Sequence, residues 1–103
     1  MAMEVKVRVD GGKATLSLSG RFDFTAHREF RQGYEGILQQ PGTKSLAIDL
    51  GGVEYIDSSA LGMLLLLKES ATAAKHTVAL VNCRGTVRRV LDVANFDKLF
   101  TLS

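Results

Sequence analysis

The sequence predicts a single α/β domain. A mixed β-sheet, made of an N-terminal hairpin and parallel strands, carries packed helices in the order β-β-α-β-α-β-α-β. Two runs of alternating apolar and polar residues open the chain, which is typical of paired strands that bury one face. Three short apolar strands then alternate with segments of helical periodicity, which indicates parallel strands joined by crossover helices. A chain of 103 residues can bury one core without metals or disulfides, so we expect one domain over residues 1–103.

The first two strands form a predicted hairpin. Residues 4–10 alternate strictly, so their three valines share one face of a strand. The Asp10-Gly11-Gly12 run is typical of a tight turn, and residues 13–19 alternate again. Residues 20–23 are then predicted to leave the sheet. The side chains of the second strand that we expect to face inward are Ala14, Leu16 and Leu18.

A helix and a third strand follow. Thr25 is the predicted N-cap of the helix, and the Pro41-Gly42 pair stops it. The third strand is predicted from Lys44 to Leu50, with Ala47 on the face opposite to its larger apolar residues. The apolar residues at helical spacing are Ala26, Phe30, Tyr34, Ile37 and Leu38, and those on one face of the strand are Leu46, Ile48 and Leu50.

The second half of the chain repeats the alternation of helix and strand. A second helix is predicted from about Ser58 to Ala74 and a strand from His76 to Asn82. A third helix begins near Thr86 and stops at Asn95, before a last short strand over residues 98–102. Cys83 is expected near a strand end as a small apolar residue.

The second helix has two predicted faces, because each residue advances about 100° around the axis. Ser58 is expected to face solvent and Ser59 the core. The core side is predicted to hold Met63, Leu66, Leu67, Ser70 and Ala74, flanked by Ala60, Leu64 and Ala71; the outer side holds Ser58, Leu61, Leu65, Lys68, Glu69 and Thr72, with Gly62 at its margin.

Two leucines on the outer side admit two interpretations. Leu61 and Leu65 lie one turn apart beside an exposed serine, and Gly62 would let a partner backbone approach closely, which favours a docking surface. Alternatively, tertiary packing covers both leucines. The sequence leaves both open.

The Asp57-Ser58-Ser59 run lies at the predicted start of this helix, where free N–H groups and the helix dipole favour a phosphate. A simpler interpretation is that Asp57 or Ser58 only caps the helix. A phosphate on Ser58 would add about −1.5 to −2 charges. In a desolvated interface such a charge costs about 2–5 kcal/mol, or roughly 30-fold to several thousandfold in affinity.

Composition excludes several classes of function. A net charge of +2 does not require nucleic acid or an acidic membrane surface as a partner. The longest apolar run, residues 60–67, is too short to span a membrane, and no signal peptide is visible. Cys83 is alone, so the chain has no internal disulfide. We therefore expect a cytoplasmic protein that does not insert into membranes.

An enzyme is not predicted. His27 and His76 are present, but no G-x-S-x-G elbow or Gly-rich phosphate loop accompanies them. Asp49 at a strand end is consistent with a phospho-accepting receiver domain, but the acidic pair expected after a first parallel strand is missing. No cluster has metal-ligand spacing. We expect no catalytic residue, no cofactor and no metal.

A resemblance to a known family rests on four stretches: Gly20-Arg21-Phe22-Asp23, Leu46-Ala47-Ile48-Asp49-Leu50, Ile56-Asp57-Ser58-Ser59-Ala60-Leu61-Gly62 and Gly85-Thr86-Val87-Arg88-Arg89-Val90-Leu91. Together they resemble the STAS family, the sulphate-transporter and anti-sigma-factor-antagonist domains. The resemblance covers nearly the whole chain and implies a STAS-like sheet with helices packed on it. In two respects the chain departs from many members: Ala60 stands where they have glycine, and the sequence ends at Ser103 without their final helix.

The resemblance implies an anti-sigma factor antagonist. Such a protein binds an anti-sigma factor that is also a serine kinase, and phosphorylation of the serine after the motif aspartate, here Ser58, ends the binding. A PP2C-type phosphatase reverses it. The resemblance also implies that Asp23 lies near the partner surface, with an arginine group at its rim. We expect a monomer. The expected partner-binding residues are Asp23, Asp57, Ser58, Ser59, Leu61, Gly62 and Leu65, and the arginines are Arg84, Arg88 and Arg89.

The same family offers an alternative, a STAS subunit of an ABC-type lipid-transport complex with a structural or regulatory role. The intact Asp57-Ser58-Ser59 run favours the antagonist, because a structural subunit does not need a serine that can be phosphorylated.

Overall fold

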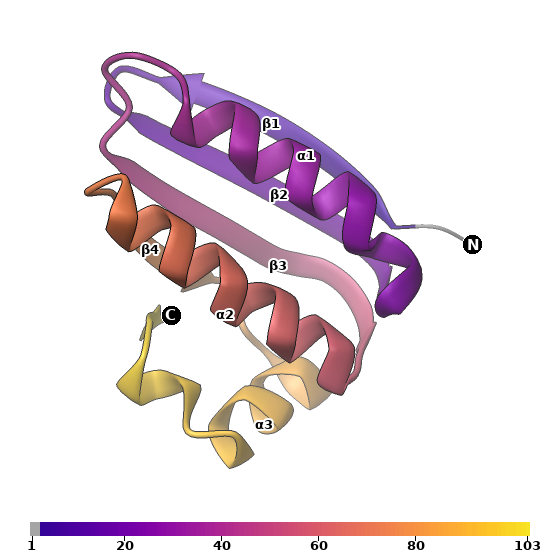
Figure 1. Cartoon of the computed structure of the whole chain (residues 1–103). Coiled ribbons are helices and arrows are strands. Elements are labelled where there is room, and N and C mark those ends of the chain that lie inside the picture. The colour runs from indigo at the N-terminus through magenta and orange to yellow at the C-terminus, as the bar shows by residue number, and fades with distance from the viewer. Residues whose placement is uncertain (1–2) are drawn as a thin grey trace.

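The computed structural model describes residues 3–103, which form one five-stranded sheet in the order β1-β2-β3-β4-β5 (Figure 1). β1 and β2 are antiparallel, and every later neighbour is parallel. This arrangement confirms the predicted mixed sheet and element order. The elements are β1 (Glu4–Asp10), β2 (Lys13–Phe22), a 3₁₀ turn η1 (Phe24–Ala26), α1 (His27–Leu38), β3 (Ser45–Ile56), α2 (Ser58–Ala73), β4 (Thr77–Val81), α3 (Gly85–Val93), a 3₁₀ turn η2 (Phe96–Lys98) and β5 (Thr101–Leu102).

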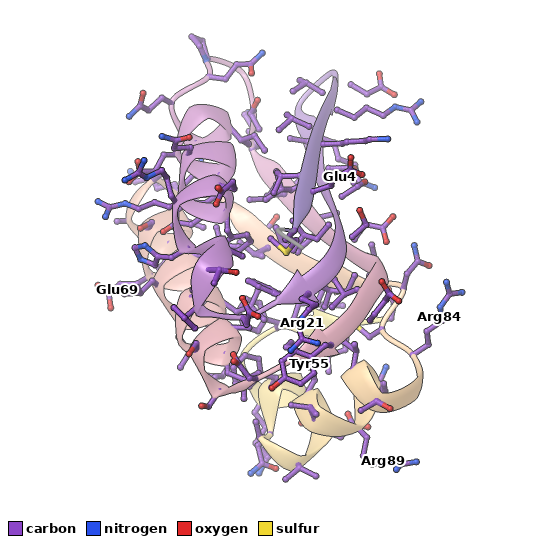
Figure 2. All side chains as sticks on the ribbon, turned by 90° about the vertical axis from the view of Figure 1, so that its right-hand side faces the viewer. Glu4, Arg21, Tyr55, Glu69, Arg84 and Arg89 are labelled. Atoms are coloured by element: carbon purple, nitrogen blue, oxygen red, sulfur yellow. The ribbon has the colours of Figure 1, made fainter. Side chains whose placement is uncertain are left out.

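The helices α1 and α2 lie side by side on one face of the sheet, and α3 packs against β3 (Figures 1 and 2). The core fills the space between sheet and helices. On the opposite face Thr15, Ser17 and Asp49 are half-buried. No helix within residues 3–103 is long and apolar enough to cross a membrane. The largest fully buried side chains are Phe22, Phe30, Leu16, Leu18, Ile37, Leu46, Ile48, Leu50, Leu64, Leu67, Leu80 and Leu91.

The sheet extends further than predicted at the ends of β2 and β3. Residues 20–22 remain in β2, and β3 continues past Leu50 to Ile56, so the predicted exit at Gly20 and the predicted strand end at Leu50 are wrong. At two places β3 has one residue more than the β2 segment that it pairs with. The first lies between the pairs Ser17–Asp49 and Ser19–Gly52, and the second follows Gly20. Gly52 permits the first, because a Cβ there would lie 2.7 Å from the Cβ of Ser19.

The start of α1 also differs from the prediction. Asp23, rather than Thr25, is the capping residue: its carboxylate accepts from the Thr25 N–H at 3.0 Å and begins η1. α1 then starts at His27 without a side-chain cap. Gly33 lets α1 approach the sheet closely, because a Cβ there would lie 3.0 Å from a methyl of Leu16. The predicted apolar stripe is confirmed, with Phe30, Tyr34 and Ile37 buried.

α2 has the predicted length, but its buried face is turned away from the predicted one. Leu66 is 51 % exposed, and Ser59, Ser70 and Ala74 are exposed as well, so their predicted core positions are wrong. Leu61, predicted to face outward, is partly buried against the core. Apolar residues surround this helix almost evenly, so pattern alone does not fix its rotation. The residues that pack inward are Ala60, Met63, Leu64, Leu67 and Ala71.

The C-terminal segment matches the prediction in part. α3 ends as predicted before Asn95, which adopts the left-handed conformation with φ 60°. Cys83 follows β4 and is buried, which confirms its expected place. The last strand is shorter than predicted, because residues 96–98 form η2 and β5 holds only Thr101 and Leu102.

The rotation of α2 predicts different effects for two adjacent leucines. Leu67→Ala should lower the free energy of unfolding by about 2–5 kcal/mol, because Leu67 is fully buried and truncation leaves a cavity. Leu66→Ala is the matched control and should cost less than about 1 kcal/mol, because the side chain is half exposed. Denaturant unfolding of both variants measures the difference. Equal losses would contradict this orientation of the helix.

Candidate functional site

The first turn of α2 is held at the end of β3 by two hydrogen bonds of Asp57. Its backbone N–H donates to the carbonyl of Phe22 at 3.4 Å, which continues the pairing of β2 with β3 by one residue. Its carboxylate accepts from the N–H of Ala60 at 3.1 Å. Asp57 is therefore the N-cap of the helix, as one sequence interpretation proposed. The cap also fixes where Ser58 lies.

Ser58 and Ser59 are both exposed in this first turn. The first N–H groups of a helix have no intrahelical acceptor, and the Asp57 carboxylate serves only Ala60. Within residues 3–103 no acceptor is found for the N–H groups of Ser58 or Ser59. The turn thus combines two accessible hydroxyls with free donors and the positive end of the helix dipole. It can accept an anionic group on either hydroxyl without burying charge.

A second group of polar contacts surrounds Asp23, just beyond the end of β2. The Thr25 hydroxyl and N–H both donate to Oδ1 of Asp23, and the Arg21 Nε lies 3.5 Å from Oδ2. The Arg21 guanidinium also stacks on the Tyr55 ring, and the two side chains lie next to each other in Figure 2. The guanidinium carbon is 4.1 Å from the centre of the ring. The hydrogen bond from the Thr25 hydroxyl, assisted by the Arg21 charge, lowers the pKa of Asp23. This carboxylate is therefore ionised at neutral pH.

The pairing of β2 with β3 brings these two groups to the same end of the sheet. Phe22 pairs with Ile56, so Asp23 and Asp57 each follow a strand end directly, on neighbouring strands. The structure thus places four of the predicted site residues together: Asp23, Asp57, Ser58 and Ser59.

Exposed apolar side chains extend from this end along α2. Phe24, next to Asp23, is 71 % exposed, and Leu65 and Leu66 on α2 are 43 % and 51 % exposed. Nothing lies within 4 Å of a Cβ built on Gly62, so this part of α2 is open. We call Phe24, Gly62, Leu65 and Leu66 the apolar strip. Leu65 and Gly62 were predicted from the sequence; Phe24 and Leu66 were not. The sequence signal for Phe24 was an aromatic residue directly after Asp23. The signal for Leu66 was that the helix has more leucines than one buried face needs.

The arginine group expected at the rim of this surface belongs to α3 and its N-cap residue. Arg84 donates to the carbonyl of Gly51 at 3.1 Å, and Arg88 pairs with Asp92 along α3. In Figure 2, Arg84 and Arg89 lie on the side of the molecule opposite Glu69 of α2. These contacts hold Arg84 at β3 and Arg88 within α3, and the place of the arginines at the rim stays a prediction.

Metal binding and thiol chemistry are two other functions that side chains of this chain could supply. Within residues 3–103 no three His, Cys, Asp or Glu side chains come close enough to hold a metal ion. Burial raises the pKa of the Cys83 thiol, so this residue behaves as a core side chain.

Comparison with known proteins places this fold in a family. Residues 5–102 match the family described as "Mlab, STAS domain". The chain belongs to the STAS family. A STAS-domain-containing protein of Pseudomonas aeruginosa strain UCBPP-PA14 is 42 % identical over 103 residues, which is the full length of both chains.

Solved structures share the same fold at low sequence identity. An anti-sigma factor antagonist from Mycobacterium paratuberculosis superimposes with a TM-score of 0.85 and 24 % identity, covering 97 % of this chain and 84 % of that one. The phosphorylated form of the Bacillus cell-fate determinant SpoIIAA superimposes with a TM-score of 0.73 and 18 % identity, covering 97 % and 91 %. These likenesses confirm the predicted STAS fold.

The contacts of Asp23 predict a change in its titration. Thr25→Val removes the hydroxyl donor and should raise the pKa of Asp23 toward the ordinary value of a carboxyl group. Because the wild-type pKa is lowered by folding, this carboxylate stabilises the protein above its unfolded pKa and loses that effect as pH falls through the folded pKa. NMR titration of the Asp23 carboxyl carbon measures the pKa of Asp23 in the wild type and in Thr25→Val, with Thr86→Val as the control. An unchanged Asp23 pKa in Thr25→Val would contradict the assigned cause.

Proposed function

We propose that this protein is an anti-sigma factor antagonist whose binding is switched off by phosphorylation of Ser58. The observation that carries the proposal is an exposed serine that directly follows the Asp57 cap and lies on the same helix as exposed leucines. Its partner is an anti-sigma factor that is also a serine kinase, and a PP2C-type phosphatase restores the unmodified form. The protein acts as a binding domain, as a monomer, and needs no cofactor.

The unmodified protein binds through the apolar strip. Aromatic and large apolar side chains supply most of the energy of an interface when they become desolvated. Phe24 and Leu65 are available for this because both are exposed in the free domain. Asp23, held ionised by Thr25 and Arg21, adds a fixed negative charge beside Phe24 that favours a cationic group on the partner.

A phosphate on Ser58 prevents this binding without unfolding the domain. The free N–H groups of the first turn and the helix dipole stabilise the added charge in the free protein. In the complex the same charge would be desolvated next to the apolar strip, at a cost of about 2–5 kcal/mol. The SpoIIAA fold has been solved in a phosphorylated form, which supports the view that the architecture tolerates the group.

Variants of Ser58 test the switch. Ser58→Ala should bind the partner constitutively, and Ser58→Asp should weaken binding about tenfold or more, because it adds a permanent charge. Thr72→Asp is the matched control: it adds the same charge to an exposed position near the other end of α2. The three proteins are immobilised and exposed to lysate of the native cells, and captured proteins are compared by quantitative mass spectrometry. A partner captured equally by Ser58→Ala and Ser58→Asp would contradict the proposal that a charge at Ser58 switches binding off.

The apolar strip gives an independent prediction. Leu65→Ala should weaken partner capture clearly and change the melting temperature little, because the side chain is exposed in the free protein. Leu61→Ala should lower the melting temperature more, because Leu61 packs partly against the core. Thermal unfolding and the capture assay give both readouts. If Leu65→Ala lowered the melting temperature strongly and left capture intact, Leu65 would be a core residue and not part of the interface.

A further inference from the structure

A hollow of about 480 Å³ lies at the edge of the sheet, away from the first turn of α2. Its walls come from the second half of α2, the start of β4 and the segment from η2 to β5. This volume is in the range of small-molecule sites in proteins. Nothing in the proposed binding switch uses it.

The hollow exists because β5 is short. β5 has two residues and pairs with β4 only at Ala79 and Leu80, so the edge of β4 before Ala79 has no neighbouring strand. The chain reaches β5 from the side through η2, and Leu99 there has φ −110° and ψ −26°, outside the extended region. The space that two further strand residues would fill remains open.

A backbone donor points into this space. The N–H of Thr77 donates to Lys44 on the β3 side at 3.1 Å. Because neighbouring N–H groups of a strand point to opposite sides, the N–H of Val78 points toward the missing part of β5. Val78 is half-buried, and β5 pairs with β4 at Ala79 and Leu80 but not at Val78, so no strand residue lies opposite this N–H on the β5 side within residues 3–103. An unpaired donor in such a place is costly unless a ligand or water accepts from it.

Two lysines face the same hollow. Lys68 of α2 is held there by Phe100, whose ring centre lies 5.7 Å from its ammonium group. Lys98 of η2 also lines the hollow, and neither lysine forms an ion pair with any of the described residues. The acidic side chain among the lining residues is Asp97, so the charge of the wall is positive. Thr72 and Thr101 add hydroxyl groups.

From this convergence of donors we infer a binding site for a small organic phosphate between α2 and β5. The phosphate would lie between Lys68 and Lys98 and accept from the N–H of Val78, and a polar organic part would fill the remaining volume. Lysine is a common phosphate ligand, because its ammonium group acts as a compact charge with several donors. The hydroxyls of the wall fit a polyhydroxylated ligand better than an apolar one.

NMR titration of the isotope-labelled protein tests the site, with inorganic phosphate and glucose 6-phosphate as probes. Sodium chloride at the same pH and ionic strength is the reference. The amide signals of Val78 and Thr101 should shift and saturate with either phosphate, and glucose 6-phosphate should bind more tightly. Lys98→Gln should weaken binding about fivefold or more, since it removes one of two charges. Lys6→Gln on β1 makes the same change outside the hollow and should leave the affinity unchanged.

Lys68→Gln gives a second measurement, with a thermal unfolding control because Lys68 also contacts Phe100. Three outcomes would overturn the site: shifts that do not saturate, shifts spread over all basic residues, or equal weakening by Lys98→Gln and Lys6→Gln. Saturable binding of inorganic phosphate without tighter binding of glucose 6-phosphate would reject the organic ligand. None of these results depends on Ser58, so the binding switch and this site can fail separately.

Discussion

The position of the candidate switch depends on how far β2 and β3 stay paired. The two strands stay paired, across two irregularities, as far as Phe22 and Ile56. The Asp57 N–H then donates to the Phe22 carbonyl. This last bond ends the strand and begins α2 at the same residue, where the Asp57 carboxylate caps the helix. Without the paired strand end, neither the cap nor the exposure of Ser58 would be fixed.

This arrangement separates the stability of the domain from its binding. The core lies between the sheet and the inner faces of the helices, whereas Ser58, Phe24 and Leu65 are exposed. A charge added at Ser58 touches no core contact, and the helix N-terminus favours it. In a desolvated interface the same charge would cost several kcal/mol of binding free energy. One modification can therefore change the affinity for a partner by orders of magnitude while the fold persists.

The sequence predicted the fold and the Asp57-Ser58 junction because these follow from local rules: alternation in strands, helical spacing and a capping residue. Prediction from the sequence failed where contacts between elements determine the structure. The rotation of α2 could not be predicted, because leucines surround that helix and only the packed structure shows that Leu67 faces inward and Leu66 outward. The extension of β3 past Gly51-Gly52 was missed, because glycines usually end strands and only pairing with β2 retains them here.

The most direct test of the central claim is phosphosite mapping of the protein isolated from its native cells, during growth and under stress. We expect phosphate on Ser58, with an occupancy that changes with condition, and none required on Ser59. Complete coverage of the peptide around Asp57 with no phosphate on Ser58 in any condition would contradict the switch. That result would instead favour the constitutive role of a STAS subunit in an ABC-type lipid-transport complex.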